Sequence, residues 1–142
     1  MAAVALNPVE GISISKPTLW TSRILGGLVT VFLLFDGIMK VIKEPHVIQA
    51  SAEFGFSPNQ MVLIGSILLI CTVLYAIPRT AILGAMLLTG YLGGAVVSQI
   101  RVGHGLFECS FPVIFGGLAW LAIYLREPRL RALVPLRIVR HE

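Results

Sequence analysis

Four long apolar runs, almost free of charge, constrain this chain more than any other feature of its sequence. They cover a stretch from residue 19 or 24 to about residue 39, and residues 61–77, 81–100 and 109–125. A helix needs about 20 apolar residues to cross the roughly 30 Å hydrocarbon core of a bilayer. The runs are continuous and lack the alternation of barrel strands. The sequence therefore predicts an all-α fold, an integral membrane four-helix bundle.

Composition excludes the other broad classes. Of the 142 residues, 56% are hydrophobic and 13% are charged, and the mean hydropathy is +0.89. A water-soluble domain carries about 25% charged residues, and a small one exposes too much surface to hide this apolar excess. The same composition excludes a disordered chain. The 2 cysteines are too few for a disulfide scaffold.

Local capping signals mark the ends of the runs. Ser57, Pro58 and Gln60 have the spacing of a capping box with proline in the first turn, which predicts that the second span begins there. Pro78 ends that span, and Thr80 is expected to cap the next one after a short turn. The two middle spans therefore form an antiparallel helical hairpin.

The connection between the first two spans, residues 41–58, is predicted to lie at the membrane surface. Glu44 followed by Pro45 is a pattern that starts a short helix, and Val47 and Ile48 supply an apolar face. Two roles remain open for this segment: a lid over the adjacent end of the bundle, or a simple connector.

The distribution of Lys and Arg predicts the orientation. An even number of spans places both termini and the turn at residues 78–80 on one side of the membrane. The cations on that side number eight, namely Lys16, Arg23, Arg79, Arg126, Arg129, Arg131, Arg137 and Arg140, whereas the other side holds only Lys40, Lys43 and Arg101. The positive-inside rule places both termini in the cytoplasm. The predicted parts are a cytoplasmic N-terminal segment (residues 1–18), a transmembrane domain (19–125) and a basic cytoplasmic tail (126–142).

Polar residues that could carry chemistry are predicted to gather at the outer ends of the spans. A charge inside a bilayer costs about 2.5–3.5 kcal/mol on insertion scales, so such residues usually serve pairing or function. Judged by the rise of about 1.5 Å per helical residue, those that reach this end are Asp36, Lys40, Gln99, Arg101, His104 and Glu108. Lys40 follows Asp36 by one turn and so lies on the same helix face.

Two interpretations of these residues remain open. In the structural one, Asp36 pairs with Lys40 or Arg101 and ties the helix ends together. In the functional one, they form a polar pocket open to the outer leaflet. Asp36 and His104 are then acid–base partners, and Arg101 or Lys40 holds an anionic or carbonyl group. A phenol in hydrocarbon also needs a partner, and the expected ligand-binding residues are Tyr91, Gln99 and Glu108.

Other chemistries have little support in the sequence. The 3 histidines are too few and too scattered for a metal or haem site. Cys71 and Cys109 lie at different depths, so an intrachain disulfide is not expected. The basic tail lacks aromatic platforms, so nucleic acid is not an expected partner. No cofactor is evident from these residues alone.

Small residues follow one face of the third span at Gly90, Gly94 and Ser98. Spacing of this kind lets a second helix approach closely. We expect that helix to belong to the same bundle, and the alternative is homo-oligomerisation through this face.

Several stretches together resemble the DoxX-like family of small bacterial four-span membrane proteins. They are FDGIMK at residues 35–40, FGFSP at 54–58, LTGYLGGAV at 88–96 with RVG at 101–103, and LREPRLRALVPLR at 125–137. The resemblance covers about residues 20–137. It implies a multi-pass four-helix bundle in the bacterial inner membrane. It also implies a loose link to quinone- and thiol-linked redox chemistry, with a redox enzyme as partner.

Two functions therefore remain open. One is an accessory or structural subunit linked to membrane redox processes, as the resemblance implies. The other is a small membrane-embedded enzyme or binder that acts on a lipophilic molecule, such as a quinone, by acid–base chemistry at the outer-leaflet pocket. A bundle packed solid around Asp36 and Tyr91 would leave the second function without a site. The lipid bilayer is a partner in both.

Overall fold

The computed structural model describes residues 13–133 of the chain. This part contains six helices and no strand, which confirms the predicted all-α fold. Four of the helices are long and apolar enough to cross a membrane. In chain order the helices are α1 (Lys16–Val41), α2 (Pro45–Glu53), α3 (Pro58–Ala76), α4 (Ala81–Arg101), α5 (Leu106–Arg126) and α6 (Pro128–Leu133).

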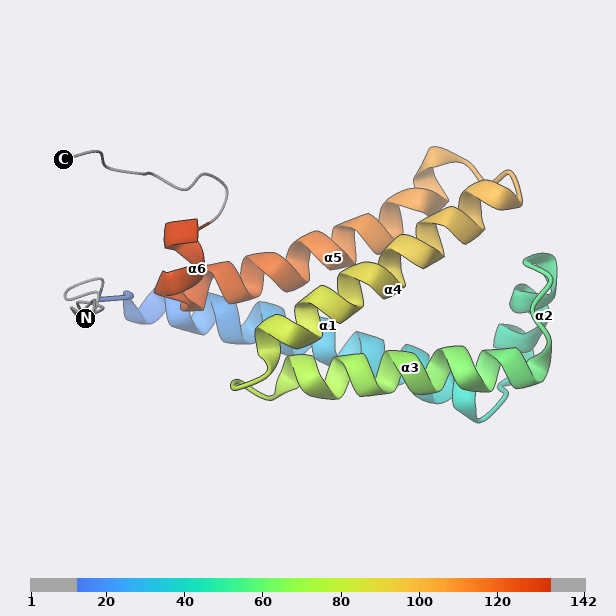
Figure 1. Ribbon diagram of the computed structural model, residues 1–142, viewed down its shortest axis with the longest axis horizontal. Helices are drawn as coiled ribbons and strands as arrows, with labels where there is room; N and C mark the ends of the chain where they lie inside the picture. The colour runs from blue at the N-terminus through green and yellow to red at the C-terminus, as the bar shows by residue number, and fades with distance from the viewer. Residues whose placement is uncertain (1–12, 134–142) are drawn as a thin grey trace, which may run out of the picture.

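The four long helices form a ring in which each contacts two neighbours. α1 packs on α3 and α5, and α4 packs on the same two helices. Within residues 13–133 the diagonal pairs, α1 with α4 and α3 with α5, make no such contact. Figure 1 shows that α4 and α5 lie close to α1 and α3 at one end of the bundle and diverge from them toward α2.

We call the end with residue 13, α6 and the turn between α3 and α4 the proximal end, and the end with α2 the distal end (Figure 1). The described chain enters and leaves at the proximal end, as an even number of spans requires. Of the predicted proximal cations, Arg137 and Arg140 lie outside the described residues. The others are Lys16, Arg23, Arg79, Arg126, Arg129 and Arg131.

The predicted helix starts are partly correct. Ser57 and Gln60 form the complete capping box of α3, with the Ser57 N–H donating to the Gln60 Oε1 at 2.7 Å. Glu44 caps α2, as its carboxylate accepts a backbone N–H of the first turn at 3.0 Å. Thr80 precedes α4 as predicted, but its side chain does not cap that helix. Its hydroxyl turns back and donates to the Leu74 carbonyl at 2.8 Å, which fastens the turn to the end of α3.

The core lies in the proximal half, where all four long helices meet. The buried hydroxyl of Ser22 in α1 donates to the Ala122 carbonyl in α5 at 2.6 Å. The Tyr75 hydroxyl in α3 donates to the Ala119 carbonyl, also in α5, at 2.9 Å. Gly84 in α4 approaches Tyr75 so closely that a Cβ there would lie 2.2 Å from the Tyr75 nitrogen. Close approach and interhelical hydrogen bonds are what hold helices together in a bilayer.

α1 and α3 stay in close contact into the distal half. A Cβ built on Gly65 would lie 2.9 Å from the Gly37 carbonyl oxygen and 2.7 Å from the Lys40 Cβ. The last turns of α1 therefore rest directly on α3, and this contact sets the position of Lys40.

Candidate functional site

Asp36 and Lys40 form a half-buried ion pair on α1. Asp36 follows the buried Leu33 by three residues and so lies near the inward face of the helix. Its carboxylate contacts the ammonium group of Lys40 one turn later. The side chain of Lys40 is 14% exposed and that of Asp36 is 36% exposed. Each charge therefore offsets much of the cost of placing the other at the end of a membrane span.

A second polar group joins the two sides of the bundle at the distal end. The His104 Nδ1 contacts the Gln99 Oε1 at the end of α4. Its Nε2 lies 3.7 Å from the Glu53 Oε2 at the end of α2. The imidazole ring also lies edge-on to Phe54, with ring centroids 5.4 Å apart. The turn between α4 and α5 is thus held against α2.

Glu53 is a member of this group that the sequence did not predict, and Phe54 follows it directly in the chain. Both belong to the connection between the first two spans, which was expected to lie over this end. The signal that could have indicated Glu53 was the presence of an acidic residue in a segment expected to lie over this end. Its partner depends on where the turn with His104 lies, and no local pattern gives that position.

Tyr91 of α4 also faces the interior. Its ring packs against the buried core. That hydroxyl makes no hydrogen bond with any residue from 13 to 133. Every fully buried side-chain polar atom in this part has a partner, so the Tyr91 hydroxyl is not fully buried.

The six residues predicted to meet at one mouth do not form one group in the structure: Asp36 contacts Lys40, and Gln99 contacts His104. Arg101 and Glu108 are exposed, and neither forms an ion pair within the described part of the chain. Asp36 pairs with Lys40, and His104 belongs to the other polar group. The separation follows from the divergence of α4 and α5 from α1 toward the distal end (Figure 1).

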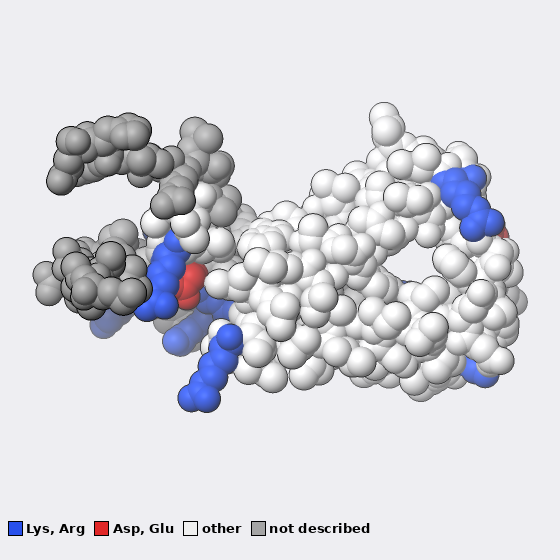
Figure 2. Space-filling model, in the orientation of Figure 1, with Lys and Arg blue, Asp and Glu red and all other residues white. Residues whose placement is uncertain are grey.

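The divergence leaves a hollow in the distal half, which Figure 2 shows as a gap between the two sides of the molecule. We call it the distal hollow. α1 and α3 border it on one side and α4 and α5 on the other, while α2 and the turn that carries His104 close its outer end. The bundle is therefore not packed solid in its distal half.

A four-span bundle is the arrangement that the resemblance implied. The model of the DoxX-like family matches residues 24–122. The chain belongs to the DoxX-like family. No curated protein and no solved structure matches the chain. In this DoxX-like protein the matched region holds both polar groups and the distal hollow, and it ends before α6.

The glycine face of α4 corrects one expectation from the sequence. A Cβ at Gly90 or Gly94 would meet nothing within 4 Å. The Ser98 hydroxyl donates to the Gly94 carbonyl of its own helix at 2.9 Å. These residues do not pack inside the bundle of this DoxX-like protein, because Gly84 near the start of α4 makes the close approach to α3 instead. An apolar groove of about 380 Å³ lies beside them, between α4 and α5.

The cysteines and potential metal ligands of this DoxX-like protein lie apart. Cys71 is a buried free thiol in α3 and Cys109 is a half-buried free thiol in α5. Among residues 13–133 no three His, Cys, Asp or Glu side chains are placed to hold a metal ion together.

Proposed function

We propose that this DoxX-like protein binds a lipophilic molecule with a polar, carbonyl-bearing head in the distal hollow. The observation that carries the proposal is the hollow that the four long helices leave in the distal half. Two of these helices carry polar groups suited to a ligand: the Asp36–Lys40 pair on α1, and on α4 the Tyr91 hydroxyl, which is not fully buried and has no partner among residues 13–133. Ligand sites are mostly apolar cavities with a few well-placed polar groups. A hollow between membrane helices, with polar groups carried by two of the helices that border it, is of that kind.

The available donors suit a carbonyl oxygen. The tyrosine hydroxyl donates one hydrogen bond, and a lysine ammonium has three N–H donors, of which Asp36 does not use all. A quinone offers two carbonyl acceptors on a flat apolar ring, and its isoprenoid tail is soluble in the bilayer. Hydrogen bonds of this kind are stronger where water is scarce. We therefore choose a quinone as the first ligand to test.

The arrangement favours binding over acid–base catalysis. Asp36 is paired with Lys40, whereas His104 is held by Gln99 and Glu53. A general acid and base must both come within hydrogen-bond reach of one substrate. The two groups lie in different parts of the distal end, so Asp36 is proposed as the residue that positions the Lys40 ammonium.

Thermal unfolding of the purified protein in detergent, with and without a short-tail benzoquinone, tests the proposal. The quinone should raise the unfolding temperature of the wild type by several degrees. Tyr91→Phe and Asp36→Asn should lose most of this shift. Tyr124→Phe at the proximal end and Arg101→Gln at the exposed helix end are matched controls that should keep it.

Two results would overturn the proposal. One is a wild type that no quinone stabilises. The other is a Tyr91→Phe variant that folds and keeps the full shift, since the Tyr91 phenol has no hydrogen-bond partner among residues 13–133.

A second candidate is an accessory subunit of a membrane redox assembly, the role that the family resemblance implies. The observation that favours it is the outward glycine face of α4, which no helix of the bundle covers. Gly90→Leu should then detach the partner in membrane extracts without changing the stability of the isolated protein. A variant that keeps every partner of the wild type would exclude this face.

A further inference from the structure

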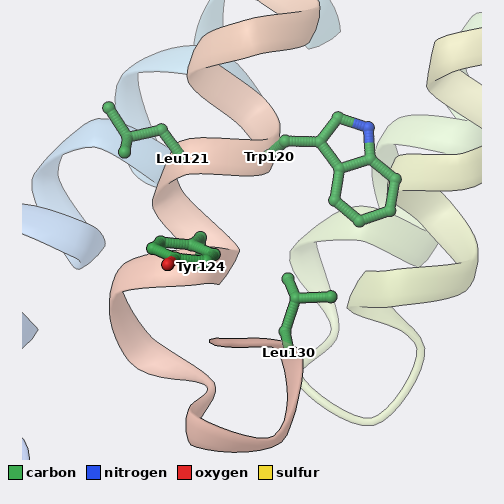
Figure 3. A pocket seen from close by; sticks show the side chains of 4 residues that line it. All are labelled: Trp120, Leu121, Tyr124 and Leu130. Atoms are coloured by element: carbon green, nitrogen blue, oxygen red, sulfur yellow. The ribbon is translucent and has the colours of Figure 1, made fainter. Parts of the chain in front are cut away.

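A second recess lies at the proximal end, away from the distal hollow. It is an apolar groove of about 300 Å³, and its walls are Trp120, Leu121 and Tyr124 of α5 and Leu130 of α6 (Figure 3). The chain becomes extended at Glu127 after α5, and α6 then folds back so that Leu130 is buried. The groove thus exists because α6 turns back against α5.

One cation lies at the edge of this groove. The guanidinium of Arg131 lies over the Tyr124 ring, with its central carbon 5.7 Å from the ring centroid. Its Nε donates to the Tyr124 carbonyl at 2.8 Å, and a terminal nitrogen donates to the Leu125 carbonyl. These carbonyls belong to the last turn of α5, where a helix lacks internal partners for them.

Arg131 has hydrogen-bonding capacity left over. A guanidinium has five N–H donors, and the two carbonyls use two of them. Within residues 13–133 no carboxylate pairs with Arg131. The remaining donors are therefore available to an anion, and a guanidinium suits a phosphate because it can donate two parallel hydrogen bonds.

The proximal end around the groove also combines cationic side chains with aromatic ones. The proximal end carries several exposed Lys and Arg side chains, which Figure 2 shows in blue. Trp120 and Tyr124 are the amphipathic aromatic residues that membrane proteins place at the lipid–water boundary. An apolar groove with a cation at its edge, at the end of a membrane span, is complementary to an amphiphile with an anionic head and a hydrocarbon tail.

We propose that this groove binds one acyl chain of an anionic phospholipid, with the lipid phosphate held by Arg131. The site is independent of the distal hollow, and its α6 wall lies beyond the residues that match the family model. Leu121 and Tyr124 contact the chain, while Arg131 remains bonded to the end of α5. Binding therefore also fastens α6 to α5.

Lipid retention by the full chain tests this site. The protein is purified in detergent, mixed with equal amounts of phosphatidylglycerol and phosphatidylcholine, and analysed by native mass spectrometry. The wild type should retain phosphatidylglycerol in preference. Arg131→Gln should retain at least tenfold less, whereas Arg79→Gln, which removes an exposed cation at the same end, should stay within twofold of the wild type.

A second pair of variants tests the apolar part without changing any charge. Leu121→Trp places a larger side chain in the groove. Leu83→Trp on α4 is the control, because the two leucines are similarly exposed, at 44% for Leu121 and 50% for Leu83. Leu121→Trp should lower phosphatidylglycerol retention, and Leu83→Trp should not. Free glycerol phosphate, which has the head but no tail, should compete only weakly.

Four results would overturn the proposal. Equal losses in Arg131→Gln and Arg79→Gln would indicate diffuse surface charge. Unchanged retention in Leu121→Trp, in a protein that still unfolds cooperatively, would exclude the groove. Strong competition by glycerol phosphate would indicate an anion site without a tail. A change of oligomeric mass in Leu121→Trp, with lipid retention intact, would assign the groove to a second copy of the chain.

Discussion

The proximal and distal halves of this bundle are built from the same four helices and differ in how those helices meet. In the proximal half, the Ser22 and Tyr75 hydroxyls donate to carbonyls of α5, and Gly84 touches the backbone of α3. In the distal half, α4 and α5 diverge from α1 and α3, and polar side chains bond to other side chains. One half is a packed core, and the other encloses a hollow.

The difference between the two halves shows that a glycine permits close helix packing only where two helices cross. Gly84 lies where α4 crosses α3 and permits a backbone contact. Gly90 and Gly94 lie about two and three turns further along the same helix, and a Cβ at either position would meet nothing within 4 Å. Small residues let helices approach in a bilayer, but the crossing point selects which of them are used. Gly90 and Gly94 are exposed and lie away from the buried face of α4, which includes Gly84 and Leu88.

The largest expected effect is at this crossing. Gly84→Ala places a Cβ 2.2 Å from the Tyr75 nitrogen and 2.5 Å from its Cα. Backbone atoms cannot rotate away, so α4 must move, and we expect a loss of about 3 kcal/mol in the free energy of unfolding. Unfolding by SDS, followed by circular dichroism, measures this. Gly90→Ala is the control and should change stability by less than about 0.5 kcal/mol; equal effects at both positions would remove the distinction between the halves.

A smaller effect is expected from the two interior tyrosines. Tyr75→Phe removes a buried hydrogen bond and leaves the Ala119 carbonyl without its partner, which should cost about 1 kcal/mol. Tyr91→Phe removes a hydroxyl with no partner in the described structure, so the unliganded protein should unfold at the same temperature as the wild type. If Tyr91→Phe proved the more destabilising in the absence of ligand, the hollow would be packed rather than open.

The smallest effect concerns the contact that closes the distal end. The His104 Nε2 and the Glu53 Oε2 lie 3.7 Å apart, and the two side chains are 30% and 68% exposed. Ion pairs at exposed positions contribute at most about 1 kcal/mol to stability. A double-mutant cycle with His104→Ala and Glu53→Gln should therefore give a coupling energy below that value. His46→Ala is the control, since its ring is 90% exposed and lies 4.0 Å from Glu44. A coupling of several kcal/mol would mean that this contact, rather than the proximal core, orders the bundle.

Much of the fold could be predicted from local sequence signals. The four apolar runs, the capping box at Ser57 and the short helix that begins after Glu44 all agree with the structure. The contact between Asp36 and Lys40 was one of two pairings considered, and it needs only the spacing of one helical turn. Each of these features depends on residues that are near one another in the chain.

The candidate site was less predictable, because its contacts cross between helices. Residues at the same depth were expected to meet, yet Arg101 and Glu108 remain apart from Asp36. Glu53 became a partner of His104 although no pattern in either segment indicates the other. Depth in the membrane follows from counting residues, whereas rotation and tilt of a helix follow from its neighbours.

The sequence by itself determined that this chain has four helices apolar enough to cross a membrane, the location of each to within a few residues, and that charge gathers at the ends of the spans. Hydrophobicity and capping act over a few residues, so they can be read without knowledge of the fold. Only the tertiary structure decided which glycines pack, which polar groups meet, and that one half of the bundle stays open. Those outcomes depend on where the helices cross. A close approach such as that of Gly84 to Tyr75 fixes how α4 packs on α3, which cannot be read from either helix alone.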